Sequence, residues 1–189
     1  MHGGHIGQLL RAYQQKPFTR VVILVDKRPE HKPHATPWRH RLKIAELTFA
    51  AFDSPFDYEI MSIENSLALK LHESIDYKIT GIDSLVDNLG DPSRLAFAQR
   101  WPMVVLSIPG VEQVELTRAI TALPEPLRKS ICYEYVGPDI PMMNYDFDEK
   151  TFMTRRVHAT DLREGKEPSL MPLTVRAYIR THRLYDRKA

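Results

Sequence analysis

Two histidines flank two glycines near the start of the chain, in the stretch HGGH at residues 2–5. An imidazole donates hydrogen bonds or carries positive charge, and glycine lets the backbone approach a bound group closely. Apolar residues at helical spacing follow, so we expect the stretch to lie directly before a helix, where unpaired backbone N–H groups bind anions. The pattern predicts a phosphate site. Taken alone, it is explained equally well by a tag remnant or by chance surface histidines.

A second group of polar residues lies towards the other end, in VHATDLREG at residues 157–165. Thr160 and Arg163 are three residues apart, where a short helix is expected to begin after an extended segment. A hydroxyl and a planar guanidinium placed in this way can bind one phosphate. An ordinary helix cap with a solvated arginine has the same pattern. The two stretches together favour a phosphate site to which both ends of the chain contribute.

The elements that would position these residues alternate between strands and helices. Continuous apolar runs predict strands buried on both faces at residues 21–25 and 103–108, and further strands are expected at 56–64 and 131–136. The expected helices cover residues 4–15, 37–53, 81–89 and 111–123, and residues 136–152 form a long irregular connection. This alternation predicts an α/β fold, a doubly wound parallel sheet with helices on both faces. Ligands of such sheets collect at the carboxyl ends of the strands.

Two helices carry recognisable signals at their ends. Thr36 is the expected N-cap of the helix that begins at Pro37, because proline is favoured at the first helical position. Thr80 and Asp83 resemble a capping box that opens the helix GIDSLVDNL, and Gly90 is expected to end it.

Length and composition limit the classes of protein to consider. A chain of 189 residues and 21.9 kDa is the size of one domain, which we expect to span residues 1–189. A net charge of +2 is too small to indicate a nucleic-acid partner. We find no signal peptide and no apolar run near the ~20 residues that cross a bilayer, so we expect a cytoplasmic protein without a membrane partner. The single cysteine, Cys132, lies in the apolar stretch ICYEYV and is expected to be buried.

Taken in order, these motifs resemble those of the HxGH nucleotidyltransferases, and within them the bacterial nicotinate-mononucleotide adenylyltransferases. HGGH is similar to the first signature of the family and VHATDLR to the second. Further similar segments are EHK at 30–32, HRL at 40–42, IDSL at 82–85 and the tail LMPLTVRAYIRTHRLY at 170–185. They follow the family's order along nearly the whole chain, and the tail is the most specific of them.

The resemblance implies a Rossmann-like nucleotidyltransferase domain that transfers AMP from ATP to nicotinate mononucleotide, forming deamido-NAD and releasing pyrophosphate. Catalysis would consist of holding the reactants in line and neutralising charge on the phosphoryl oxygens. The implied roles are phosphate contact and transition-state stabilisation for His2 and His5, ATP binding for Gly4, β- and γ-phosphate binding for Thr160 and Arg163, and a cation beside the substrate for Lys32. Mg²⁺ would arrive with ATP, without a dedicated protein metal site.

The sequence departs from the family at several points. The family's glycine-rich strand, which ends at the first histidine, is absent, so we expect the sheet to lack its first strand. Ser107, Ile108 and Pro109 stand where the family has G-x-D, and His158 stands where serine is usual. The tryptophan segment that contacts the pyridine ring has no clear counterpart, although Trp101 is near that region. These departures leave the acceptor and the adenine contacts open.

Three alternatives therefore stand beside the adenylyltransferase. One is an HxGH-type nucleotidyltransferase for another phosphorylated acceptor, and the second is a catalytically inactive nucleotide-binding homologue. The third is a metal-binding module built on His2, His5, His31 and His34, which is disfavoured because structural zinc sites usually include thiolates and Cys132 is distant in sequence. The sequence leaves the oligomeric state open.

Overall fold

The computed structural model describes residues 1–27, 35–63, 75–91, 95, 99–108, 113–137, 143–154, 161–162 and 164–185. The chain forms two compact units. Unit 1 comprises Met1–Leu10, Pro17–Asn65 and Met143–Ala189, and unit 2 comprises Arg11–Lys16 and Ser66–Met142. Helix α1 (Gly3–Gln15) contributes residues to both units. The expectation of a single domain over residues 1–189 stays a prediction.

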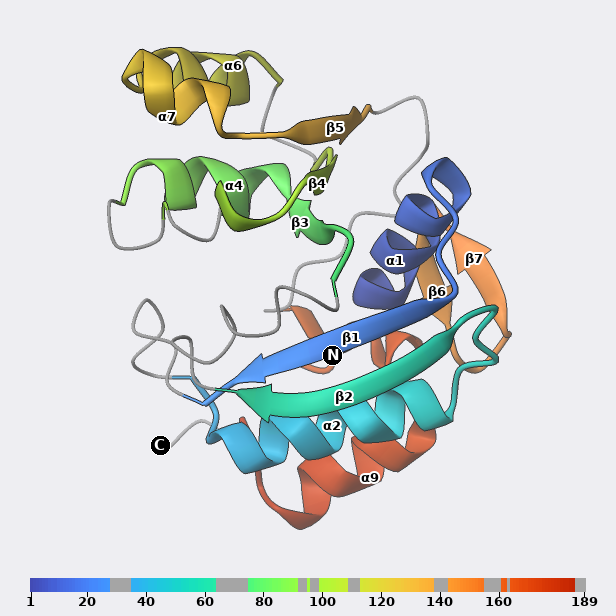
Figure 1. Ribbon diagram of the computed structural model, residues 1–189. Helices are drawn as coiled ribbons and strands as arrows, with labels where there is room; N and C mark the ends of the chain where they lie inside the picture. Colours follow the sequence, from blue (N-terminus) through green and yellow to red (C-terminus); the bar gives the residue numbers. More distant parts are fainter. Residues whose placement is uncertain are drawn as a thin grey trace. The chain divides into compact units, whose positions relative to one another are not determined.

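Unit 1 is built on a parallel β-α-β arrangement. Strands β1 (Arg20–Asp26) and β2 (Asp57–Ile63) pair in parallel, from Arg20 opposite Asp57 to Asp26 opposite Ile63. Helix α2 (Trp38–Ala50) connects them and packs along both strands (Figure 1). It buries a face made of Ile44, Ala45, Thr48 and Phe49. A parallel pair requires a crossover of this kind, so the sequence prediction is confirmed for this segment.

The last part of unit 1 contains a hairpin that the sequence analysis missed. Strands β6 (Asn144–Asp146) and β7 (Thr151–Met153) pair in an antiparallel manner, so residues 136–152 are not a wholly irregular connection as predicted. A carboxylate oxygen of Asp146 accepts the backbone N–H groups of Asp148 and Glu149, which shapes the turn. The short helix η2 (Pro168–Leu170) and helix α9 (Leu173–Thr181) follow, and α9 packs against α2.

Unit 2 contains a second parallel sheet, with strand order β3 (Lys78–Gly81), β4 (Met103–Leu106), β5 (Tyr133–Val136). Helix α4 (Ile82–Leu89) follows β3, and helices α6 (Gln113–Thr121) and α7 (Glu125–Lys129) lie between β4 and β5 in the sequence. The core is formed by Ile82, Leu85, Leu89, Met103, Val105, Leu116 and Ile131. The structure thus confirms a mixed α/β fold with parallel sheets.

The burial of β1 differs from expectation. Within the run at residues 21–25 only Val25 is buried, and Leu24 is 37% exposed. In the described part of the chain β1 pairs with β2 alone, so one side of the strand has no strand neighbour. The prediction of a strand is confirmed, whereas the prediction that both faces are buried is wrong.

The predicted caps of two helices also shift. Pro37 precedes α2 as its N-cap, and the helix begins at Trp38 without a side-chain cap from Thr36. Thr80 lies in β3 because that strand pairs with β4, where Thr80 is opposite Val105. The N-cap of α4 is Gly81, again without a side-chain hydrogen bond, so the predicted capping box does not form.

The predicted burial of Cys132 is wrong. Cys132 precedes β5 and is exposed. Within ICYEYV only Ile131 and Val136 are buried, because the short strand turns most of its residues towards the surface or the boundary of the core.

No helix in the described ranges has both the length and the apolar composition that membrane crossing requires.

Candidate functional site

The HGGH stretch forms the start of α1 and does not precede it as a loop. The helix begins at Gly3, so only His2 lies before it, and His5 is in the first turn. The ring nitrogen Nδ1 of His2 accepts the backbone N–H of Gly4 at 3.1 Å. The first N–H groups of a helix have no partner within the helix, and this bond satisfies the one of Gly4. The helix therefore begins at Gly3, one residue earlier than predicted.

The two imidazoles meet at this helix start. Their ring centroids are 4.1 Å apart and the ring planes are inclined by 66°. His2 is half-buried and His5 is exposed. Because Nδ1 of His2 accepts a hydrogen bond, the proton of the neutral ring is on Nε2, which is then a donor. Two imidazole groups at the positive end of a helix are suited to binding an anion.

The glycines of α1 are required by close packing against β6. A Cβ atom on Gly3 would lie 2.0 Å from the carbonyl oxygen of Tyr145, and one on Gly7 would lie 1.7 Å from that of Met143. Gly4 has a different environment, since a Cβ there would lie 2.9 Å from Oδ1 of Asn144 and 2.9 Å from Cε1 of His2. Packing therefore accounts for Gly3 and Gly7, while Gly4 is the glycine beside the imidazole pair. Its contact with ATP stays a prediction.

Asn144 is a candidate site residue that the sequence analysis missed. It is the first residue of β6, it is 1% exposed, and its Oδ1 atom lies beside Gly4. The buried amide and the His2 imidazole therefore both border Gly4. No sequence signal identified it, because the hairpin that carries it was itself not predicted.

The Met1 α-amino group adds little positive charge to this helix start. Burial lowers the pKa of the Met1 α-amino group to about 6, so the group is largely neutral at pH 7. On β6, burial acts to raise the pKa of Asp146, but backbone N–H groups of Glu149 and Asp148, the Ser169 hydroxyl and Arg176 lower it overall. The Asp146 carboxylate is therefore ionised and already engaged in the turn.

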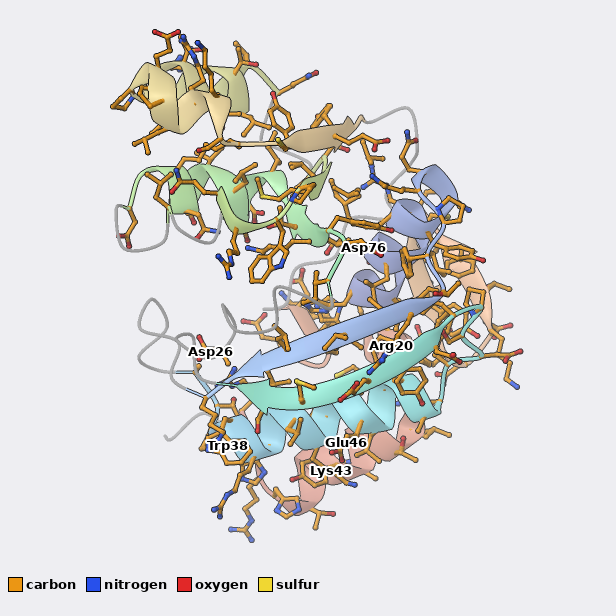
Figure 2. The ribbon with its side chains drawn as sticks, in the orientation of Figure 1. Arg20, Asp26, Trp38, Lys43, Glu46 and Asp76 are labelled. Atoms are coloured by element: carbon orange, nitrogen blue, oxygen red, sulfur yellow. The ribbon has the colours of Figure 1, made fainter. Side chains whose placement is uncertain are left out.

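A separate group of polar residues lies where β1 ends and α2 begins. Arg41 of the HRL motif donates from Nε to the carbonyl oxygen of Thr36 at 2.8 Å and from Nη2 to that of Asp26 at 2.5 Å. It thereby ties the end of β1 to the chain just before α2, and Figure 2 shows Asp26 and Trp38 at the same end of these elements. The EHK segment lies between Asp26 and Thr36 in the sequence and outside the described residues.

Positive charge gathers at this end of α2. Lys27 Nζ lies 5.3 Å from the ring centroid of Trp38, and Arg39 Cζ lies 5.5 Å from it, both in cation–π geometry. The first turn of α2 contains no acidic residue, so its positive helix end is not neutralised within that turn. Lys27 and Arg39 were not predicted as site residues, although the sequence has a tryptophan beside basic residues at the start of a predicted helix.

Several predicted site residues lie outside the described residues. They are Lys32, Thr160 and Arg163, together with His31 and His34 of the metal-binding alternative. Within the stretch similar to the second signature, Asp161 and Leu162 are helical and Leu162 is buried, which agrees with the short helix predicted there. The structure thus brings His2, Gly4 and His5 together, and the approach of Thr160 and Arg163 to them stays a prediction.

The described ranges contain no group of three or more His, Cys, Asp or Glu side chains arranged to hold a metal ion. No protein-family model and no curated protein sequence matches this chain.

Proposed function

We propose that this chain is a nucleotidyltransferase of the HxGH type that transfers AMP from ATP to nicotinate mononucleotide, with release of pyrophosphate. The observation that carries the proposal is the contact between the His2 and His5 imidazoles at the first turn of α1. The resemblance assigns phosphate contact to these two side chains. A helix N-terminus supplies the same kind of interaction through its N–H groups and its dipole.

The contact between two other family-like segments supports the proposal. His40 of the HRL segment, on α2, lies with its Nδ1 atom 2.9 Å from the hydroxyl of Tyr178, on α9 of the tail. The ring centroid of His182 lies 4.3 Å from the ring centroid of Tyr178 and 5.2 Å from that of His40. The HRL segment and the tail are far apart in the sequence, and both resemble the family. Their contact is expected if both belong to the family's fold.

The chemistry needs no covalent intermediate on the protein. The acceptor phosphate attacks the α-phosphorus of ATP, and pyrophosphate leaves from the opposite side. In this proposal His2 and His5 donate hydrogen bonds to phosphoryl oxygens, Thr160 and Arg163 hold the β- and γ-phosphates, and Lys32 adds positive charge. Mg²⁺ bound to ATP supplies further charge neutralisation. Precise positioning dominates catalysis of this kind, because a displacement of ~1 Å can cost about a hundredfold in rate.

The proposal includes a further strand beside β1. A doubly wound sheet of this family has a glycine-rich central strand that ends at the first histidine, and β1 has β2 as its one strand neighbour in the described part of the chain. A strand added along β1 would cover its apolar residues and give His2 a rigid support. We therefore expect activity to be highest in a chain extended at its N-terminus by such a strand.

The test is pyrophosphate release from ATP in the presence of nicotinate mononucleotide, measured for the chain of 189 residues and for an extended chain. We expect His5→Ala and Arg163→Ala each to lower kcat at least about tenfold, equivalent to ~1.4 kcal/mol of barrier. The matched control is Arg118→Ala, which changes an exposed side chain and should keep turnover within about twofold of the unsubstituted chain. Unchanged turnover in both His5→Ala and Arg163→Ala contradicts the proposal.

One observation favours a different acceptor or a binding protein without catalysis. Ser107 replaces the first residue of the family's G-x-D segment, and it is buried and hydrogen-bonded to Arg11. Calorimetry separates the possibilities. Binding of ATP without pyrophosphate release from any of a panel of mononucleotides would indicate an inactive homologue, whereas release with another phosphorylated acceptor would indicate a relative of different specificity.

A further inference from the structure

Arg11 is a buried arginine whose hydrogen bonds within the described ranges all go to neutral groups. It lies in α1, belongs to unit 2 and has no exposed surface. One terminal nitrogen, Nη1, donates to the carbonyl oxygen of Ser107 at 3.1 Å. The other, Nη2, donates to the Ser107 hydroxyl at 2.8 Å and to the carbonyl oxygen of Gly137 at 3.1 Å.

Within the described ranges, the charge of Arg11 and two of its five N–H donors have no partner. One of these donors is on Nε, and no carboxylate of the described residues forms an ion pair with the guanidinium. Burial lowers the pKa of Arg11, with a smaller opposing effect from Tyr135, but guanidinium remains protonated in proteins. Enclosing a charge without a counter-charge is costly, and such groups are normally paired. The arrangement is therefore incomplete unless an anion approaches it.

Arg11 lies where a sheet of this class binds ligands. Ser107 and Gly137 directly follow β4 and β5, two neighbouring parallel strands. The backbone N–H of Ser107 donates to the carbonyl oxygen of Val136 at 3.0 Å, so the two strands are still paired at this point. The carboxyl ends of parallel strands are the usual ligand-binding edge of open α/β sheets.

We propose that Arg11 anchors an oxyanion of a small ligand, a phosphate monoester or a carboxylate, at the carboxyl ends of β4 and β5 in unit 2. The guanidinium has five N–H donors, of which the Ser107 and Gly137 contacts use three. The Nε–H group is among those left for the ligand. This inference concerns Arg11 alone and does not depend on nucleotidyl transfer.

The complete burial of Arg11 constrains how binding occurs. An anion reaches the guanidinium only when the surrounding surface opens, so binding is expected to be slower than a diffusional encounter. The bound anion would neutralise the enclosed charge, and the ligand would therefore stabilise unit 2.

The first test is thermal unfolding of the full chain with inorganic phosphate or nicotinate added at constant ionic strength. Fluorescence of Trp101, which is buried in unit 2, reports the transition in a Trp38→Phe background. We expect phosphate or nicotinate to raise Tm above a chloride control, and the larger rise identifies the phosphate or the carboxylate chemistry. Arg11→Met should abolish this rise. Arg128→Met, which removes an exposed arginine of α7, should retain it.

The second test observes the guanidinium directly. In ¹⁵N-resolved NMR spectra of the full chain, the slowly exchanging Arg11 Nε–H signal should shift on titration with phosphate or nicotinate and should be absent in Arg11→Met. If Arg11→Met does not fold, Arg11→Lys keeps the charge but loses the Nε donor, and its affinity for the anion should be at least about tenfold weaker. The proposal is overturned if the anion raises Tm equally with and without Arg11, or if the Nε–H signal does not shift. Arg11 would then have only the structural role of linking the ends of β4 and β5.

Discussion

Strands β1 and β4 have the same kind of sequence and very different surroundings. Both are short apolar runs rich in valine, but each residue of Met103–Leu106 is at most 2% exposed. In β1, by contrast, Leu24 is 37% exposed and only Val25 is buried. Strand β4 lies between β3 and β5, whereas β1 pairs with β2 alone in the part of the chain that the structure describes.

The difference shows what an apolar run does and does not specify. A continuous β-branched run indicates a strand, because these side chains fit a pleated surface. Whether both faces are buried depends on how many strands and helices surround it. The sequence of β1 is suited to a second strand neighbour, which the proposed sheet would supply.

The largest expected effect comes from the same substitution in the two strands. Leu106→Ala should lower the free energy of unfolding of unit 2 by about 2–5 kcal/mol, because it leaves a cavity in an enclosed strand. Leu24→Ala should lower that of unit 1 by less than about 1 kcal/mol, since the side chain is already partly in water. Urea unfolding checks this through the fluorescence of Trp101 in unit 2 and Trp38 in unit 1. Equal losses would show that β1 is as enclosed as β4.

A pH series sharpens the comparison between the units. The described core cluster of unit 2 is apolar, whereas unit 1 buries Asp146, whose pKa is lowered overall. Its ionised form stabilises the fold fully above the unfolded pKa of about 4, and this stabilisation is lost as pH falls through the lower folded pKa. Asp146→Asn should therefore cost about 1–3 kcal/mol at pH 7.

That cost should shrink as pH falls below about 4, because the carboxyl is then protonated in the unfolded chain and folding must release that proton, until the folded carboxyl is protonated as well. Unfolding curves monitored by Trp38 between pH 7 and pH 3 measure it. A difference between Asp146→Asn and wild type that does not change with pH would show that the carboxylate charge does not stabilise unit 1.

Amide hydrogen exchange tests directly how many strands pair with β1 and with β4. The amides of β4 face paired strands on both sides, whereas amides on the side of β1 away from β2 have no strand partner in the described ranges. We expect the latter to exchange at least about tenfold faster, because they open without breaking a ladder. In the chain extended by a further strand, the same amides should become protected. Slow exchange of these amides in the original chain would contradict the account of β1.

The smallest expected effect concerns an exposed ion pair between β1 and β2. Arg20 and Glu59 form this pair, and Figure 2 labels Arg20 on β1. Glu59→Gln should lower the free energy of unfolding of unit 1 by about 0.2–1 kcal/mol, and added salt should reduce the difference, because exposed pairs are screened. A larger and salt-insensitive loss would mean that this side of the sheet is more enclosed than its exposure indicates.

The elements predicted from the sequence are those with strong local patterns. Strand β4 was predicted from its continuous apolar run, and helix α2 from apolar residues at helical spacing. Both patterns lie within the element itself. The β6–β7 hairpin was missed because Asn144 and Asp146 are polar but buried, and their partners are set by tertiary packing and by the turn. The cap predicted at Thr80 was wrong because pairing with β4 drew that residue into a strand.

The candidate site residues were likewise predictable where a local sequence motif carries them. The types and spacing of His2 and His5 predicted a phosphate site near the start of a helix; the structure brings their rings together there, and phosphate binding stays a prediction. Arg11 was missed because an arginine in an amphipathic helix is usually exposed. No sequence signal identified its burial.

The most direct test of the account is a structure of the extended chain with a non-hydrolysable ATP analogue. It measures the distances from the His5 imidazole and the Arg163 guanidinium to the triphosphate. The account predicts that both side chains form hydrogen bonds to oxygens of the same triphosphate. A triphosphate that contacts only one of them, or neither, would contradict it.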